Sequence, residues 1–441
     1  MKKAIKCVLK SIGLLRVSQN LNHKRNMLFS NIGFMRRVAL CRFRYWRHVR
    51  RIRHMPKSSK VRVLFIVSEI AKWKEQSLYE AMEASDVFEP IVGISAWNQQ
   101  DENRCPDNEL DEVLLKAESF FDRMKDRHVR TVRTHPREYS DLSEFNPDIV
   151  FYTEPWGPGE GQDAESVSSI ALTCFLPYYI PAWGNVERNC RLPLHFFLWR
   201  FFAQNEIWAR YWKKHCHWLT YVPKFIPTGH PALDCFAEFA HKSTDMRDCV
   251  IYAPHHSIYV EGARPMPQYI STFKETGHAI LAFAQKHPEI KWVFKPHPVM
   301  KWRFVDSGYM TLQEVDAYYD AWRKIGAICQ DGDYQQLFIE SRAMITDSGS
   351  FLMEYGATGR PLVRLVSCHD EGFNVDSTRE VCDSYYNVHT QQELMDTLEL
   401  VIVRGEDPKR NVRLKAVSRA ALADVDAAKN IVDYLREELR R

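Results

Sequence analysis

Short, almost uninterrupted apolar runs recur along this chain, each followed by a polar turn and an amphipathic stretch. Runs of this kind cover 61–67, 148–152, 250–253, 291–295 and 343–346. They suit strands that are buried on both faces, as in a parallel sheet. Because the strands alternate with helical patterns, the sequence predicts a doubly wound α/β fold.

The alternation runs through two successive sets, and 441 residues are too many for one ordinary core. We therefore expect two Rossmann-like domains that face a central cleft. The first, an acceptor domain, would cover 61–226, and the second, a nucleotide-donor domain, would cover 227–420. A terminal helix at 421–441 would end a long helical stretch that begins near 412.

Between 192 and 224 the alternation lapses into an aromatic-rich segment whose centre is 196–202. Rings at helical spacing usually pack inside a protein, so a core helix is favoured here. Contact of these rings with a membrane is the alternative.

The first 60 residues form a basic arm. Residues 1–62 contain 18 Lys or Arg, and the first acidic residue is Glu69. Of the 60 basic residues in the chain, 42 then remain against 56 acidic ones, so the body is acidic. Such asymmetry indicates an anionic partner for the arm.

Apolar residues recur at helical spacing through the arm, but no run approaches the roughly 18–20 residues that span a bilayer. This pattern predicts an amphipathic segment on an anionic membrane surface. A solvated extension, helices packed on the body, and nucleic-acid binding through the ring-and-cation mixture at 42–47 are the alternatives. No recognised nucleic-acid motif follows, so we expect no nucleic-acid partner.

The 11 cysteines are scattered without a C-x-x-C pair, which is typical of reduced thiols in a cytosolic protein. The triplet His215-Cys216-His217 lacks a second ligand pair at a useful spacing, so we expect no metal site. We also expect no cofactor apart from a nucleotide-activated donor substrate.

A Ser/Gly-rich turn lies where the strand at 343–346 gives way to a helix. Backbone N–H groups, hydroxyls and the helix dipole can converge there on a phosphate. Glu354, one turn further on, could accept hydrogen bonds from a ribose. The alternative is that these Ser and Gly residues serve only as ordinary turn and N-cap residues. The donor-binding candidates are Lys295, Thr346, Asp347, Ser348, Gly349, Ser350 and Glu354.

Three proline-stiffened loops carry histidines beyond strand ends, where α/β proteins bind ligands. His297 lies between two prolines, and His255 and His256 follow Pro254. Imidazoles there can donate to a phosphate or transfer a proton, so we predict these three as catalytic. Further candidates are His230 in a third such loop, Arg264 near the diphosphate, and Tyr178.

The segments 229–234, 252–256, 295–298, 333–337 and 345–350 make the chain resemble the CDP-glycerol glycerophosphotransferase family. Gly359-Arg360-Pro361 follows in the same order, and the resemblance covers about 227–365. It implies a GT-B-type fold and a CDP-glycerol-like donor. It also implies a lipid-linked or polymeric glycan acceptor and peripheral attachment to the cytoplasmic face of the cell membrane.

The resemblance further implies that His297 and the hydroxyls of 348–350 hold the donor's phosphates. Many members carry a Trp-His-Gly-Thr stretch in the amino-terminal domain, and its histidine is the suspected base. The comparable stretch here, 174–179, has no histidine. His255 or His256 would then supply the base, with Tyr178 in a lesser role. A nucleotide-sugar glycosyltransferase and a non-catalytic capsule-assembly scaffold are the alternative functions.

Overall fold

The computed structural model describes residues 14–68, 70–96, 107–122, 127–134, 136–155, 159–182, 192–216, 224–236, 249–263, 266, 269–328, 334–370, 372–373, 375–423 and 425–440. Of residues 14–31, 71, 107–109 and 224 only the backbone is described. Arg264 and His217 lie outside the described residues.

The first domain is built on a parallel sheet that has seven strands in the described part of the chain. Its spatial order is β3-β2-β1-β6-β7-β8-β9. The strands are β1 (Val61–Val67), β2 (Phe88–Ile94), β3 (His128–Arg130), β6 (Ile149–Tyr152), β7 (Leu172–Phe175), β8 (Arg200–Ala203) and β9 (Lys224–Pro227). Leu64 of β1 lies opposite Ile91 on one side and Val150 on the other. The strand order therefore reverses between β1 and β6, which is the topological switch point of this sheet.

The second domain repeats this plan with a six-stranded parallel sheet among the described residues, in the order β12-β11-β10-β13-β14-β15. The strands are β10 (Cys249–Ala253), β11 (Lys291–Phe294), β12 (Gly326–Ile328), β13 (Ser341–Thr346), β14 (Leu362–Leu365) and β15 (Tyr386–Val388). Ile251 of β10 lies opposite Val293 of β11 and Met344 of β13. The switch point of this sheet falls between β10 and β13.

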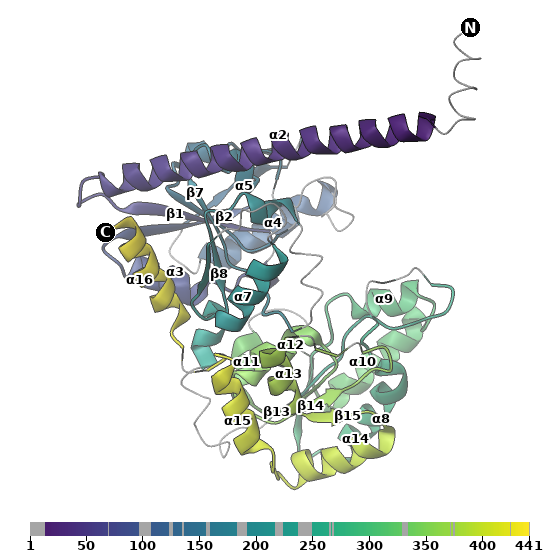
Figure 1. Cartoon of the computed structure of the whole chain (residues 1–441). Coiled ribbons are helices and arrows are strands. Elements are labelled where there is room, and N and C mark those ends of the chain that lie inside the picture. Colours follow the sequence, from purple (N-terminus) through teal and green to yellow (C-terminus); the bar gives the residue numbers. More distant parts are fainter. Residues whose placement is uncertain are drawn as a thin grey trace.

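Helices surround both sheets, and each domain has its own hydrophobic core (Figure 1). The helices are α2 (Leu14–Arg53), α3 (Gln76–Glu83), α4 (Asp107–Asp122), α5 (Ala164–Val167), α7 (Glu206–His215), α8 (Phe273–Lys286), α9 (Met300–Asp306), α10 (Leu312–Ile325), α11 (Tyr334–Glu340), α12 (Gly349–Gly356), α13 (Asp376–Asp383), α14 (Gln391–Leu398), α15 (Arg410–Arg419) and α16 (Ala427–Leu439). Shorter elements are β4 (Val132–Arg133), β5 (Glu138–Tyr139), η1 (Ile70–Lys72), η2 (Leu142–Phe145), η3 (Pro193–Phe196), η4 (Pro231–Phe236) and η5 (Glu399–Val403). All residues of β6, β7 and β10 are buried. The predicted doubly wound fold with two Rossmann-like domains is confirmed.

The basic arm contains one long helix, α2, which lies across the first domain while its amino-terminal part projects past the domain (Figure 1). Val38, Cys41, Tyr45 and Ile52 on one face of α2 are buried in the core of that domain. The Tyr45 hydroxyl lies 2.6 Å from Thr173 Oγ1 on β7. These contacts make the second half of α2 an integral part of the first domain. None of the described helices combines the length and the apolarity needed to cross a bilayer.

The last helix, α16, returns to the first domain although it follows the second in sequence (Figure 1). Its residues Ile431, Leu435 and Leu439 are fully buried in the first core. The carboxylate of Asp234 stabilises the first turn of this helix. It accepts hydrogen bonds from the backbone N–H groups of Ala427 and Ala428, at 2.9 and 3.0 Å. The chain thus crosses between the domains twice.

Two predictions about secondary structure are wrong. The aromatic run at 196–202 forms η3 and the strand β8 rather than a core helix, because a continuous apolar run between two strands also suits a strand buried on both faces. The long helical stretch from 412 is two helices, α15 and α16, and Ala421 between them has a left-handed φ of 52°.

Candidate functional site

The switch point of the second sheet brings three of the predicted loops together. The loops that follow β10, β11 and β13 carry the 255–256 pair, His297 and the 347–350 turn respectively. The backbone N–H of His297 donates to Pro254 O at 3.2 Å, which joins the first two loops. The backbone N–H of His255 donates to Asp347 Oδ1 at 2.6 Å, which joins the first to the third. Segments about 90 residues apart in sequence therefore form one site.

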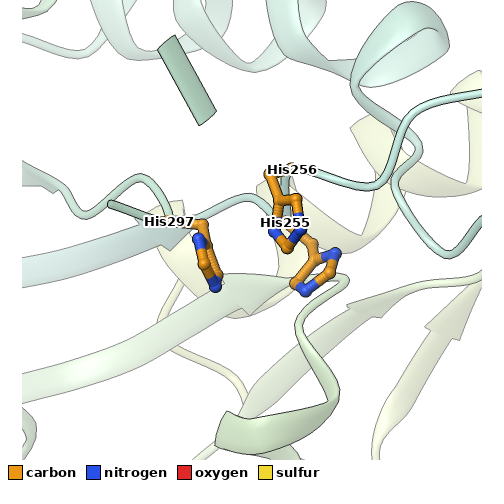
Figure 2. Close-up of side chains that lie close together, drawn as sticks. All are labelled: His255, His256 and His297. Atoms are coloured by element: carbon orange, nitrogen blue, oxygen red, sulfur yellow. The ribbon is translucent and has the colours of Figure 1, made fainter. Parts of the chain in front are cut away.

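The imidazoles of His255, His256 and His297 lie side by side at this point (Figure 2). Their ring centroids are 4.2 Å apart for 255 and 256, 4.1 Å for 256 and 297, and 5.1 Å for 255 and 297. All three side chains are partly buried. We call these rings the histidine trio.

Hydrogen bonds from the backbone fix the proton position on two rings of the trio. The N–H of Ser257 donates to His255 Nδ1 at 3.1 Å, and the N–H of Val299 donates to His297 Nδ1 at 3.4 Å. A neutral imidazole that accepts at Nδ1 carries its proton on Nε2. His255 and His297 therefore present Nε2–H donors, whereas the buried Nδ1 of His256 has no hydrogen-bond partner among the described residues.

The surroundings of the trio are positively charged. Burial lowers the pKa of His297 to about 4 and that of His256 to about 3. The charge of Lys295 adds to the first shift, and those of a protonated His297 and of Arg303 add to the second. Burial likewise lowers the pKa of His255, so the three imidazoles are neutral near pH 7.

The trio could hold either a metal ion or an anion. Its ligand nitrogens lie within 4.8 Å of one another, which is close enough for a metal ion to draw them together. Coordination of a metal through Nε2 would, however, require the proton of His255 and of His297 to move from Nε2 to Nδ1. In both rings a backbone N–H already donates to Nδ1. A divalent cation would also meet Lys295 and Arg303. Two N–H donors with neighbouring cations favour an anion such as phosphate.

Asp347 and Thr346 hold the loops together. The buried Asp347 carboxylate accepts from the backbone N–H groups of His255 and Thr272, at 2.6 and 2.7 Å. Burial nevertheless raises its pKa to about 6. Thr346 Oγ1 donates to Ala253 O at 2.7 Å and accepts from Ser348 N at 2.9 Å. Both side chains therefore position the site through other residues.

The 348–350 turn forms the amino-terminal end of α12. Ser348 is the N-cap residue and is buried, Gly349 is the first helical residue, and Ser350 is exposed. The early N–H groups of a helix and its dipole favour a negative charge at this end. The end of α12 therefore adds to the anion-binding character of the trio's loops.

Glu354 lies deeper in α12 and is enclosed by a network between the domains. Its Oε2 accepts from the Tyr334 hydroxyl and lies 3.9 Å from Lys74 Nζ of the first domain. Lys74 Nζ in turn donates to the Tyr334 hydroxyl. Burial raises the pKa of Glu354, and the charges of Lys74 and Lys295 oppose that shift. Lys295 Nζ also lies 5.2 Å from the Tyr334 ring centroid. The Glu354 carboxylate, which was predicted to accept hydrogen bonds from a ribose, thus accepts one from Tyr334.

The further candidates lie outside the trio. His230 is buried, with its Nε2 2.6 Å from Pro177 O and its Nδ1 accepting from Ala232 N at 3.2 Å, so both ring nitrogens serve the local structure. Tyr178 is partly buried, and its ring centroid lies 5.6 Å from Lys72 Nζ in the first domain.

Sequence reasoning missed Ser257, Arg303, Lys74 and Tyr334. Tyr334 stands inside a segment on which the family resemblance rests, and Ser257 directly follows the histidine pair, so both had a local signal. Lys74 had none, because its role depends on contact between residues 260 positions apart.

The chain matches no protein-family model and no curated protein. Solved structures resemble it in fold at low sequence identity. The wall teichoic acid polymerase TagF superposes with a TM-score of 0.55 at 11% identity, over 91% of this chain and 98% of that one. The UDP-GlcNAc 2-epimerase of Neisseria meningitidis, solved with UDP-GlcNAc, gives 0.52 at 15% identity, over 86% and 100%. A putative UDP-N-acetylglucosamine 2-epimerase of Listeria monocytogenes gives 0.50 at 15% identity, over 86% and 96%. The chain thus has a two-domain fold of the GT-B type.

Proposed function

We propose that this chain transfers glycerol phosphate, or a related polyol phosphate, from a CDP-activated donor to a membrane-associated glycan or polymer in cell-surface polysaccharide synthesis. One observation carries the proposal: the histidine trio, Lys295, Arg303 and the end of α12 meet at the switch point of the second sheet. Doubly wound folds bind ligands at such points, and this one offers several donors to an anion.

In the proposed reaction a hydroxyl oxygen of the acceptor attacks the β-phosphorus of the donor. The new O–P bond forms while the bond between this phosphorus and the bridging oxygen breaks, and CMP leaves with the electron pair. The Nε2–H groups of His255 and His297 would donate to the phosphate oxygens on which charge develops. The similarity in fold to the TagF polymerase is consistent with this chemistry.

The membrane partner belongs to the same proposal. The first domain carries α2, on which Ile32, Met35, Phe43 and Trp46 are exposed among many arginines. Apolar side chains flanked by cations suit an anionic bilayer surface. We place the protein at the cytoplasmic face of the cell membrane, where a lipid-linked acceptor would reach it.

A test compares radiolabelled CDP-glycerol with UDP- and CDP-sugars as donors, in the presence of EDTA. We expect release of CMP from CDP-glycerol and transfer of label to the acceptor without a metal ion. His297→Ala should lower the rate by about 10²–10³-fold, as for loss of one charge-stabilising donor. His389→Ala, at an exposed histidine of the same domain, is the matched control.

Other outcomes would contradict the proposal. Transfer of sugar alone would assign the site to a glycosyltransferase, and the UDP-GlcNAc 2-epimerase of similar fold was solved with a nucleotide sugar. Failure of calorimetry to detect any bound nucleotide would indicate a non-catalytic scaffold. Full activity of the His297→Ala variant would remove the trio from the reaction.

A further inference from the structure

The switch point of the first sheet carries a polar site as well. Ser68 directly follows β1, and Glu154 lies two residues beyond β6, so both stand where the strand order reverses. Glu154 Oε1 accepts from the Ser68 hydroxyl, and Lys72 Nζ donates to Oε2 at 2.9 Å. The side chain of Glu154 is 10% exposed. A carboxylate at this position is thus held in place but retains access to solvent.

A second carboxyl close by has a different environment. Glu75 is fully buried, its Oε2 accepts from the backbone N–H of Lys74 at 2.9 Å, and its Oε1 has no hydrogen-bond partner among the described residues. Burial raises the pKa of Glu75 to about 8, and the charge of Glu154 contributes to this shift. Glu75 is therefore protonated near pH 7. Two carboxyls with opposed environments are the usual arrangement when one of them acts as a base.

Contacts between the domains connect this site to the donor site through a series of residues. Lys74 lies two residues from Lys72 and donates to the Tyr334 hydroxyl of the second domain. The ring of Tyr334 lies 5.2 Å from Lys295 Nζ, and Lys295 is two residues from His297. The loop after β1 therefore contacts Glu154 through Lys72 and the donor-site residues through Lys74.

The histidine trio is poorly suited to take a proton from the acceptor. His255 and His297 present N–H donors, and Lys295 and Arg303 further favour an anion beside the trio. An imidazole occupied by the donor's phosphates is not available to the acceptor hydroxyl. The comparable stretch of the first domain, 174–179, contains no histidine.

We propose that Ser68, Lys72 and Glu154 form a binding site for the acceptor hydroxyl, and that the Glu154 carboxylate is the general base. The inference rests on the proposed function and deepens it. The hydroxyl proton passes to Glu154 as the oxygen attacks the β-phosphorus, and CMP leaves on the side of the histidine trio. Ser68 and Lys72 are positioning residues, since they hold the carboxylate.

The experiment compares Glu154→Gln with Glu118→Gln in steady-state transfer from CDP-glycerol. Glu118 is a matched control, because its carboxylate also pairs with a cation, Arg130, in the same domain. We expect Glu154→Gln to lower kcat by about 10²–10⁴-fold, the usual contribution of a general base. Its dissociation constant for CDP-glycerol, measured by calorimetry, should stay within about twofold of wild type.

A second variant separates catalysis from a merely structural role. The groups that face Glu154 among the described residues include Lys72, Ser68 and Glu75. Loss of the cation in Lys72→Met should raise the pKa of the base, so the acid limb of kcat/KM should move to higher pH. Glu118→Gln should leave that limb in place.

Two results would overturn the inference while leaving the proposed function intact. The first is wild-type kcat in Glu154→Gln. The second is a pH profile of kcat/KM whose acid limb stays in place in Lys72→Met but disappears in His256→Asn. That profile would assign the base to His256. If the wild-type protein neither binds nor consumes CDP-glycerol, the proposed function fails first and the inference falls with it.

Discussion

At the scale of single residues, the histidine trio shows how burial sets the protonation of a site. Each ring lies among groups that disfavour its charged form, and Lys295 and Arg303 strengthen the effect. Neutral rings can lie close together without repulsion between charges, and an anionic donor beside them would favour their protonated forms.

The pH dependence of stability follows from these pKa shifts. The unfolded chain takes up protons on these residues near the usual histidine pKa of about 6.5, whereas folded His297 does so near 4 and His256 near 3. The unfolded state thus binds more protons between these values, so stability should fall as the pH drops below about 6.5. We expect a loss of up to about 1 kcal/mol per pH unit for each ring, seen as a falling Tm between pH 7 and pH 5.

Replacement of His256 by Asn should flatten this slope, because it removes one of the rings whose pKa burial lowers. A nucleotide diphosphate should also flatten the slope by raising the pKa values of the rings. A Tm profile that is the same in the His256 variant and in wild type would show that the trio does not titrate as described.

At the scale of elements, α2 combines two faces with different tasks. Its buried face includes Val38, Tyr45 and Ile52. Arg37 pairs with Glu165 at 3.1 Å and Arg51 with Asp148 at 2.7 Å, so some of its cations serve the fold. A separate stripe is exposed at helical spacing and consists of Ile32, Met35, Phe43 and Trp46.

The exposed stripe leads to a prediction about membrane binding. Phe43 and Trp46 are 55% and 56% exposed, and their rings stack at 5.9 Å. The double variant Phe43→Ser/Trp46→Ser should weaken binding to anionic vesicles by about tenfold or more, since it removes apolar area that would enter the interface. Vesicle sedimentation measures this effect.

Leu115→Ser, at an exposed leucine of α4, provides the control and should bind vesicles as wild type does. Binding of CDP-glycerol should be unchanged in both variants. Equal vesicle binding by the Phe43/Trp46 variant and wild type would mean that α2 serves only to complete the first domain.

At the scale of the whole molecule, the two domains are joined by α16 and by the Lys74–Tyr334–Glu354 network. The network places an ion pair with side-chain exposures of 6% and 4% between the domains. Removal of one member of a buried pair leaves the other charge without compensation, which typically costs about 3–5 kcal/mol.

Lys74→Met should therefore destabilise the protein, but by roughly 1–3 kcal/mol, because Lys295 still acts on Glu354. Urea unfolding measures the change. Adding Glu354→Gln to Lys74→Met should recover part of the loss. Lys429→Met removes an exposed pair with Asp433 and should cost less than about 0.5 kcal/mol. A Lys74 variant as stable as the Lys429 variant would show that the network does not hold the domains together.

The sequence by itself determined the alternation of buried strands and helices, and with it the two doubly wound domains. It also determined that His255, His256, His297 and the 347–350 turn follow strand ends, because a motif beyond an apolar run is a local feature. Periodicity could not separate a strand from a helix at 196–202, since a short continuous apolar run suits both.

Only the tertiary structure decided which of these residues meet and what each one does. Asp347 braces the loops, Tyr334 holds Glu354, and Lys74 reaches across from the other domain. The tertiary structure also showed that Ser68 and Glu154, 86 residues apart in sequence, lie at one switch point. Strand order and contacts between domains depend on long-range packing, and no local pattern in a single sequence records them.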